Sequence, residues 1–531
     1  MTEVQVEAQG GEYESRVLAA RCSNSYVFLS IFVATALWLA FSIPSIFSMA
    51  LWVFADRGSF LHLDDLVTKG HRVAIDVYYN YGLLPVLVQR VIFAIFGAGY
   101  MPILVAGLIY AAALGALWAA ILRRMTRNTY AILGSLTIIP FLIWNNPNLP
   151  YVGVNLAIFG ALLLILQGRY NLALASAAVG ALSVPSLPLA MFLGIACIIV
   201  AEWALEGDFK PASLIASLLP GLATYTLVAS LLAAVFGWHS LIATILPVSG
   251  SAYYEAQGWG FGGHALHEYL APSYLNFAGL LRYWLGGDRV LWWGASTLAI
   301  TIFGIMATTR MVRAERIEPC MVFVAACSAM HAVFVIFAYG SPQQHTVYDP
   351  ILLAGVLGGI FFLQLGRWRK PLFIAFIGLS AFTNLGELRH GLLAWRDVAR
   401  TPATAGLMAN PEFAKEWGAI VDRSKRSQLF LLSYSSGPGH YFPTVHSPQP
   451  WFLMHGMIYP SEWKTVLNEV RKADLIAVDW RSYDFVQTDG DLRLLLSGLC
   501  VESETENFII FNRHGNSKQC LPAMRHIKWK Q

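Results

Sequence analysis

Charged side chains gather in one short stretch of an otherwise apolar chain. Asp56 and Asp76 mark its two ends, and Arg57, Lys69 and Arg72 lie between them. A carboxylate can take a proton from a hydroxyl group or orient it, and basic side chains can bind the oxygens of a phosphate. These residue types therefore suit transfer of a group from a phosphate-bearing donor to a hydroxyl. A charged loop that is merely solvated is the alternative that composition alone favours.

The composition of the chain restricts what can position these residues. Of 531 residues, 56% are hydrophobic and 13% are charged, whereas a soluble domain has about 25% charged residues. This balance excludes a soluble enzyme, a disordered protein and a disulfide-stapled scaffold. The net charge of +4 is too small to indicate binding of nucleic acid. The composition predicts a mainly α-helical protein that spans a lipid bilayer many times.

Apolar stretches long enough to cross a membrane can be counted, since each crossing needs about 20 such residues. Two stretches are too long for one crossing and carry breakers, at 145–150 and at 185–188, where proline disfavours a helix. With these breaks we expect about 11 spans, of which 171–184 is the thinnest. The uncharged stretches are 26–55, 101–122, 129–168, 170–201, 211–238, 290–309, 320–339, 350–366 and 371–386.

The distribution of Lys and Arg predicts the orientation of these spans. Clusters such as Arg123-Arg124 fall on alternate connections, and cytoplasmic connections are the ones enriched in such residues. Arg16 and Arg21 precede the first span, which is too long for the apolar core of a signal peptide, so we expect an uncleaved anchor and a cytoplasmic amino terminus. An odd number of spans then places the carboxyl terminus outside, which is the periplasm if the membrane is a bacterial inner membrane.

This orientation predicts three parts. Residues 1–25 form a cytoplasmic tail, residues 26–386 form the membrane domain, and residues 387–531 form a small periplasmic α/β domain. The outer loop 55–100 of the membrane domain carries the charged stretch. In the last part, the patterns predict helices at 412–422 and 460–472 and strands at 429–434, 475–479 and 508–511.

Two further features lie outside the spans. Val86–Phe96 is apolar but too short to cross a membrane, which predicts a helix in the interface. Cys500 and Cys520 share the outer domain, where an oxidising compartment would favour a disulfide between them, the alternative being two unpaired thiols.

The outer loop resembles a known family in its order of features. The first span is followed by Asp56, then after about 20 residues by Asp76, an aromatic stretch, Tyr81-Gly82-Leu83-Leu84, and an apolar run ending in Phe96-Gly97. This order is similar to the first outer loop of GT-C glycosyltransferases, in particular bacterial members related to protein O-mannosyltransferases and aminoarabinose transferases. The detailed similarity covers about 45 residues, and the layout of about 11 spans with an outer domain extends it over most of the chain.

The resemblance implies an active site at the outer face of the membrane. It implies transfer of a sugar from a polyprenyl-phosphate donor to a hydroxyl group of a lipid, glycan or protein, usually with inversion at the anomeric carbon. Asp56 matches the catalytic base, and Asp76 matches the second acid, which positions the acceptor or, in metal-using members, a divalent metal. Arg57 departs from the pattern, since many relatives have an acid there; it favours an ionised Asp56 and disfavours a metal at that pair.

Several residues are candidate substrate contacts, each with a structural alternative. Tyr81 belongs to the matched segment, and Lys69, His71 and Arg72 can bind donor phosphate or balance the nearby acids. His345 lies in an outer loop at the mouth of a span, where it can contact phosphate or simply be exposed. Arg90 can extend to the lipid head groups or reach the phosphate.

Other polar residues favour structural interpretations. Asp64 and Asp65 lie in an expected helix, where a solvated face or an N-terminal turn is favoured over a reserve base. His331 lies in the middle of a predicted span, where an ionisable residue is costly and therefore suggests a function. A neutral histidine that is hydrogen-bonded to a neighbouring helix is nevertheless the favoured interpretation. The spacing of the tail histidines disfavours zinc, and that stretch is expected to shape the acceptor entrance. These histidines are His440, His446 and His455.

Two other classes of function fit a chain of this composition. A transporter or flippase of lipid-linked saccharides would carry ionisable residues at mid-membrane and repeated halves, and this chain has only His331 at such depth and no repeat. A catalytically silent assembly factor would keep the spans and tolerate loss of Asp56.

Overall fold

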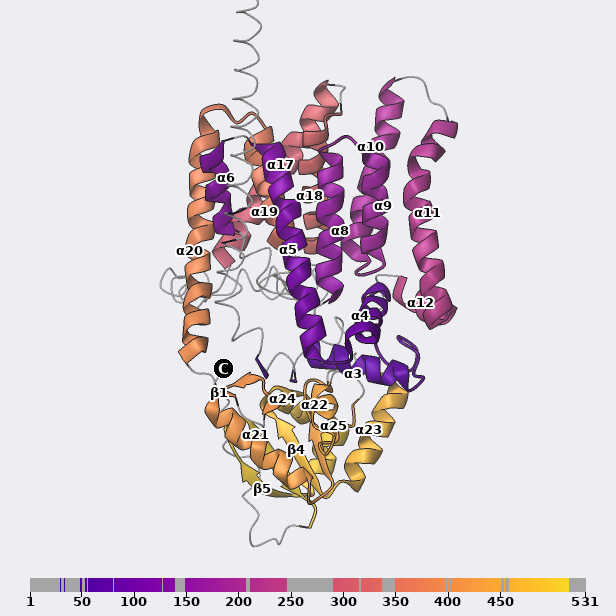
Figure 1. The fold of residues 1–531 in the computed structure, drawn as a ribbon, viewed down its shortest axis with the longest axis vertical. Helices are drawn as coiled ribbons and strands as arrows, with labels where there is room; N and C mark the ends of the chain where they lie inside the picture. Colours follow the sequence, from indigo (N-terminus) through magenta and orange to yellow (C-terminus); the bar gives the residue numbers. More distant parts are fainter. Residues whose placement is uncertain are drawn as a thin grey trace, which may run out of the picture. The chain divides into compact units, whose positions relative to one another are not determined.

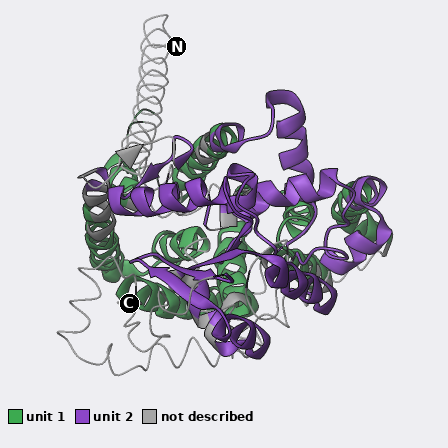
Figure 2. Cartoon of the chain, turned by 90° about the horizontal axis from the view of Figure 1, so that it is seen from below, with its two compact units in different colours: residues 1–41, 105–228, 261–389 green, residues 42–104, 229–260, 390–531 purple. Residues whose placement is uncertain are grey.

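The structure is a computed structural model that divides into two compact units (Figure 2), each described here by itself. The first comprises residues 1–41, 105–228 and 261–389, and the second comprises residues 42–104, 229–260 and 390–531. The described residues are 29, 33, 48–49, 53–54, 56–79, 81–126, 128–138, 149–206, 211–245, 290–314, 317–336, 349–396, 399–400, 404–449, 453 and 458–514.

The first unit is helical throughout its described residues, as the apolar composition predicts. Three of its helices, α5, α11 and α20, continue into segments of the second unit. Its helices (Figure 1) are α5 (Tyr100–Met125), α6 (Thr129–Ser135), η1 (Leu136–Ile138), α8 (Leu149–Ile165), α9 (Tyr170–Ala181), α10 (Ser186–Glu206), α11 (Pro211–Phe236), α17 (Val290–Ala314), α18 (Pro319–Ile336), α19 (Asp349–Phe362), η3 (Gly366–Trp368) and α20 (Arg369–Arg396).

Three of the described helices are long and apolar enough to cross a membrane by length and composition, within Tyr100–Met125, Ala212–Phe236 and Leu291–Ala314. The other apolar helices are shorter, so the count of about 11 spans stays a prediction. The expected break at 185–188 is confirmed, because α9 ends at Ala181 and α10 begins at Ser186. The break at 145–150 falls largely outside the described residues, which resume at Leu149.

Close packing holds the centre of the first unit. Helix α19 is buried from Asp349 to Ile360 and contacts both α17 and α18. Glycines make this approach possible, because a Cβ at Gly355 would collide with Ile300 of α17 and one at Gly359 would collide with Phe303 of the same helix. Small residues at helix interfaces allow backbones to approach closely where packing drives the association.

The second unit contains the outer-loop segment and the tail. Its first part has α3 (Asp56–Thr68), a turn at 72–77 and α4 (Leu84–Phe96). Helix α4 starts with a proline in its first turn and ends at Gly97, which has φ of 83°. At 13 residues it is about 20 Å long, too short to cross a hydrocarbon core of about 30 Å. Helix α12 (Trp238–Ile245) also belongs to this unit.

The tail is built around a four-stranded sheet of order β3-β4-β6-β5. Strands β3 and β4 are parallel, whereas β6 runs antiparallel to both β4 and β5. Helix α23 connects β3 to β4, as a parallel pair requires a crossover, and α21 and α23 lie on either side of β4 in the view of Figure 1. The strands are β3 (Leu429–Leu432), β4 (Leu475–Asp479), β5 (Cys500–Glu504) and β6 (Phe508–Asn512), with a separate pair β1 (Ala399–Arg400) and β2 (Met408–Ala409).

The helices of the tail are amphipathic where they cover the sheet. Helix α23 (Pro460–Lys472) buries Val466, Leu467 and Val470 against a core that includes Ile476 and Val478 of β4. The other helices are α21 (Pro411–Ser424), α22 (Gly437–Tyr441), α24 (Trp480–Thr488) and α25 (Gly490–Ser497).

The predicted tail elements are confirmed at 412–422, 429–434, 460–472, 475–479 and 508–511, to within a few residues. The sequence analysis did not identify α22, α24, α25 or β5, which are short or polar and carry a weak periodic pattern.

Candidate functional site

Helix α3 begins at the first acid of the predicted site. Asp56 is its first residue, and the free N–H groups at the start of a helix favour a negative charge. The side chain of Asp56 lies outside the described part of the structure, so its role as a base stays a prediction.

The next residue, Arg57, is buried, with 7% of its surface exposed. It lies near Tyr441 at the end of α22. Burial raises the pKa of the Tyr441 hydroxyl far above its usual range, and the charge of Arg57 opposes part of that rise. The Tyr441 oxygen is itself buried and has no hydrogen-bond partner among the described residues. A guanidinium and an available phenol hydroxyl can together bind the oxygens of a phosphate or a sugar.

The tail holds the amino-terminal half of α3 in place. The hydroxyls of Ser59 and Ser435 form a buried hydrogen bond of 2.6 Å. Gly437, at the start of α22, approaches the chain so closely that a Cβ there would collide with the carbonyl oxygen of Val53 and lie 2.8 Å from Cα of Gly58. The backbone around Asp56 is therefore fixed by residues nearly 400 positions away.

Farther along α3, Asp65 is bound by two histidines. Nδ1 of His440 lies 2.7 Å from its carboxylate and Nδ1 of His62 lies 3.9 Å away. Burial opposes ionisation of Asp65, but the hydrogen bond from His440 and the neighbouring His62 ring outweigh it and hold the pKa of that carboxyl well below its usual range.

The neighbouring acid, Asp64, has the opposite electrostatics. Burial raises its pKa, and Arg90, whose Nη1 lies 3.8 Å from Oδ1, offsets only part of this effect. The expectation that Asp64 and Asp65 form a solvated helix face is therefore wrong, because α4 and α22 cover that face and supply partners for both acids. Arg90 pairs with Asp64, a role that the sequence analysis did not consider.

The second predicted acid, Asp76, lies in the turn after α3 and binds Arg72. The guanidinium donates hydrogen bonds of 2.8 and 3.0 Å to its carboxylate, and the backbone N–H of Arg72 donates one of 2.9 Å. These bonds lower the pKa of Asp76 to about 2. Arg72 thus makes the charge-balancing contact with a nearby acid, and its binding of donor phosphate stays a prediction. Lys69 and His71 are exposed.

The Asp76 turn is also attached to the tail. The Tyr459 hydroxyl donates a 3.0 Å hydrogen bond to the carbonyl oxygen of Ala74, which has φ of 60°. Glu462 lies close by, with 9% of its surface exposed. Burial raises its pKa to about 7, with a further contribution from the charge of Asp76, against hydrogen bonds from the backbone of Tyr459 and Tyr78 that lower it.

Aromatic rings fill the space between α3 and the segment that precedes α4. Tyr81, a predicted substrate contact, lies with its ring 5.8 Å from that of Phe60 and 5.6 Å from that of Tyr79. Nε2 of Gln89 donates a 2.9 Å hydrogen bond to the carbonyl oxygen of Phe60 and thereby joins α4 to α3. Tyr81 is part of this packing, and its contact with substrate stays a prediction.

The remaining candidates are partly outside the described residues. His345, Cys520 and His455 lie there. Cys500 is disulfide-bonded, and its pairing with Cys520 stays a prediction. His331 is buried in α18 and its ring lies 5.3 Å from that of Trp293.

The two tail histidines that the structure describes have structural contacts. His440 binds Asp65, and the ring of His446 lies 5.5 Å from that of Phe430 while its backbone pairs with β3. Among the described residues, no group of three or more His, Cys, Asp or Glu side chains is arranged to hold a metal ion.

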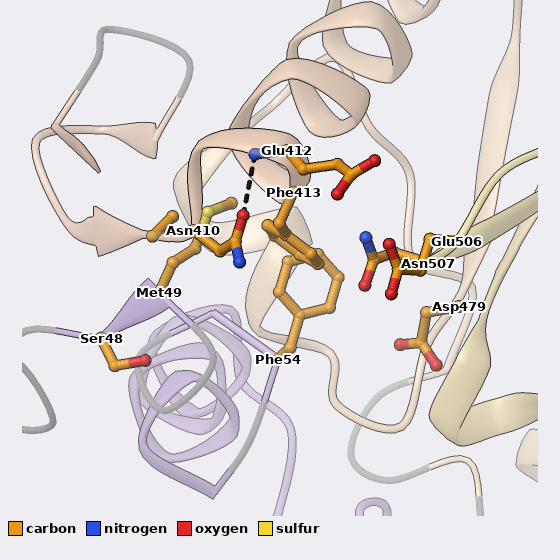
Figure 3. Close-up of a pocket in the computed structure, with 10 residues that line it drawn as sticks. Ser48, Met49, Phe54, Asn410, Glu412, Phe413, Asp479, Glu506 and Asn507 are labelled. Carbon is orange, nitrogen blue, oxygen red and sulfur yellow. Dashed lines mark hydrogen bonds between the residues drawn. The ribbon is translucent and has the colours of Figure 1, made fainter. Parts of the chain in front are cut away.

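A cavity of about 380 Å³ lies at the end of the tail sheet (Figure 3). Sequence analysis did not identify it, although Asp479, an acid at the end of a buried strand, is the kind of residue that lines such sites. It is lined by Ser48, Met49, Phe54, Ala409, Asn410, Glu412, Phe413, Asp479, Glu506 and Asn507.

No protein-family model and no curated protein matches the chain. Among solved structures, the chain is similar to the crystal structure of ArnT from Cupriavidus metallidurans bound to undecaprenyl phosphate. The similarity has a TM-score of 0.45 at 12% sequence identity, and it covers 94% of this chain and 99% of that one.

Proposed function

We propose that this chain is a membrane glycosyltransferase. It transfers a sugar from a polyprenyl-phosphate donor to a hydroxyl group of an acceptor at the outer face of the membrane. Asp56 is the base, and Arg57 and Tyr441 bind the phosphate of the donor.

The buried Arg57 beside Tyr441 is the observation that carries this proposal. A guanidinium is rarely buried without a specific purpose, because removal of a charge from water is costly. A charged loop that is merely solvated would leave Arg57 exposed. Here it lies directly after Asp56, and the tail supplies a buried phenol oxygen, that of Tyr441, close enough for the charge of Arg57 to lower its pKa.

In the proposed reaction these residues have the following roles. Asp56 accepts the proton of the acceptor hydroxyl while that oxygen forms a bond to the anomeric carbon of the sugar. The bond between this carbon and the phosphate oxygen breaks, and polyprenyl phosphate leaves with the electron pair. Arg57 and Tyr441 stabilise the charge that grows on the phosphate oxygens. Attack opposite to the leaving group inverts the configuration of the anomeric carbon.

Apolar surface supports a lipid-linked donor. Three described helices are long and apolar enough to cross a membrane. The short helix α4 leaves Val91, Ile95 and Phe96 half or more exposed, as expected of a helix that lies in the interface with its apolar side chains in lipid. The polyprenyl chain would be held by such surface.

Asp76 acts through its turn in this proposal. Its carboxylate is occupied by Arg72, so it orders the segment between α3 and α4 and positions the acceptor side of the site. Because Arg57 follows Asp56 and Arg72 binds Asp76, this pair of acids does not fit a divalent metal, and the proposed mechanism uses none.

The test is analysis of envelope glycans and lipids in a deletion strain complemented with variants of equal abundance in membranes. Wild type should restore the missing glycoconjugate, and Asp56→Asn should not. Asp491→Asn changes an exposed acid of α25 and should restore it fully. Restoration by Asp56→Asn would contradict the proposal and favour a transporter or an assembly factor.

A further inference from the structure

The cavity at the end of the tail sheet shares no lining residue with the group formed by Arg57 and Tyr441. It lies where β4 ends, at Asp479, and where the turn before β6 carries Glu506 and Asn507. In open α/β sheets ligands bind outside the carboxyl ends of strands. Its volume of about 380 Å³ falls within the range of small-molecule sites.

Aromatic rings form an ordered wall of the cavity. The rings of Phe54 and Phe413 lie 5.4 Å apart at 89°. Phe54 also packs edge-on against Trp417 at 5.0 Å, and Phe413 lies 5.4 Å from Phe508. Because neighbouring rings restrain both phenylalanines, this wall exists before any ligand binds.

The polar wall is fixed as well. Glu416 of α21 accepts hydrogen bonds from the backbone N–H groups of Glu506 and Asn507 and from the Asn507 side chain, at 3.0 to 3.3 Å. Figure 3 shows Glu412, Glu506, Asn507 and Asp479 on one side of the Phe54–Phe413 pair, with Ser48, Met49 and Asn410 on the other.

A buried carboxylate completes this wall. Asp479 is 3% exposed and accepts hydrogen bonds from the Ser433 hydroxyl at 2.5 Å and from the N–H of Ser482 at 2.8 Å. Burial raises its pKa, and these bonds only partly offset that effect.

The chemistry of the lining selects a class of ligand. The ten lining residues include three carboxylates, two amides and a hydroxyl but no Lys or Arg. Carboxylates and amide oxygens accept hydrogen bonds from hydroxyl or ammonium groups and repel anions. The rings offer apolar contact to the C–H face of a sugar. We propose that this cavity binds a saccharide that is neutral or carries an amino group, and that it rejects acidic saccharides and phosphates.

This binding site does not depend on the proposed transfer reaction. If that reaction is correct, the cavity would hold the saccharide part of the acceptor, and this assignment rests on the proposed function. The donor phosphate belongs elsewhere, because the ten described lining residues carry no positive charge.

Binding of soluble trisaccharides to the full chain in lipid nanodiscs tests the proposal. The probes are maltotriose, which is neutral, the trimer of glucosamine, which is cationic, and the trimer of galacturonic acid, which is anionic. Saturation-transfer NMR should detect the first two and not the third, and titration by calorimetry should find the glucosamine trimer the tightest.

Matched variants locate the binding. Glu412→Gln combined with Glu506→Gln should weaken the glucosamine trimer at least tenfold. Phe413→Ala should weaken maltotriose and the glucosamine trimer alike. Glu504→Gln, an exposed acid two positions before Glu506, should leave both affinities within twofold of wild type.

The proposal is overturned if neither maltotriose nor the glucosamine trimer binds, if the galacturonic acid trimer binds equally well, or if the double variant binds as wild type does. Since Glu412 and Glu506 are exposed, the double variant should keep the wild-type melting temperature. Its affinity for the glucosamine trimer therefore tests the proposal even if Phe413→Ala unfolds. Asp56→Asn should still bind the probes, so failure of the transfer reaction and failure of the saccharide site are distinguishable.

Discussion

The amino-terminal end of α3 and the turn of Arg72 and Asp76 lie in one short segment and each carries an acid of the predicted site. Their surroundings differ. Around Asp56 the tail supplies buried contacts from Ser435 and Gly437, and Arg57 is buried close enough for its charge to act on Tyr441. Asp76 has its cation four residues away, and that cation is exposed.

The difference shows how one type of residue takes two roles. An exposed pair of Asp76 and Arg72 is screened by water and contributes modestly to stability. A buried Arg57 can impose a strong field on an incoming phosphate, because the low dielectric of its surroundings strengthens each charge. In the proposed function the first region therefore carries the chemistry, and the second orders the segment.

Replacing Asp56 and Asp76 one at a time should have the largest effect. It tests most directly whether the two regions have different roles. Asp56→Asn should lower sugar transfer by at least about 10²-fold, since it removes the general base. Asp76→Asn should lower it by less than about tenfold, because the turn keeps its attachment through Tyr459. Initial rates in membranes with equal amounts of each variant check this. Equal losses would give Asp76 a direct part in the chemistry.

Disturbing the packing of α22 on the segment around α3 should have the next largest effect, and this effect is on stability. Gly437→Ala places a Cβ against the carbonyl oxygen of Val53, a backbone atom that cannot move aside, and should lower the free energy of unfolding by about 3 kcal/mol. Gly490→Ala is the control, since nothing lies within 4 Å of a Cβ there. Thermal unfolding followed by tryptophan fluorescence measures both. Similar melting temperatures for the two variants would refute the close packing of α22 on this segment.

The attachment of the Asp76 turn should depend on pH through Glu462. Its pKa is raised to about 7 in the folded chain, so the folded state favours the protonated acid and loses stability as pH rises from about 4.5 through 7. Glu462→Gln mimics the protonated form. Relative to wild type it should gain roughly 2 kcal/mol of stability between pH 5 and pH 8. Urea or thermal unfolding at both pH values checks this, and a difference that does not change with pH would contradict it.

Loss of the contact between α3 and α22, in which Asp65 binds His440, should have the smallest effect. The pKa of Asp65 is lowered, so its stabilisation is present above the unfolded value of about 3.9 and is lost as pH falls below it. Since about a third of the side chain is exposed, Asp65→Asn should cost about 1 kcal/mol at neutral pH. The gap between its melting temperature and that of wild type should narrow as pH falls from about 4 toward 2. A gap that stays constant over that range would show that the ionised form of Asp65 does not matter.

Local patterns made much of the fold predictable. The breakers between α9 and α10 and the extents of α23 and β4 agree with the sequence analysis because proline geometry and hydrophobic periodicity act over a few residues. The short α22 carries no such pattern, since a five-residue helix completes little more than one turn.

The sequence alone determined that the chain is apolar and helical, ends in an α/β tail and carries Asp56, Arg57 and Asp76 in one short polar segment. Only the tertiary structure decided that Arg57 is buried beside Tyr441, that His440 binds Asp65, and that Phe54 meets Asp479 around a cavity. These pairs are separated by more than 370 residues. Their proximity depends on how whole elements pack together, and the local hydrophobic periodicity of the sequence does not determine that packing. Burial then sets the charge state and the partners of each acid, so aspartates in the same short segment acquire different roles.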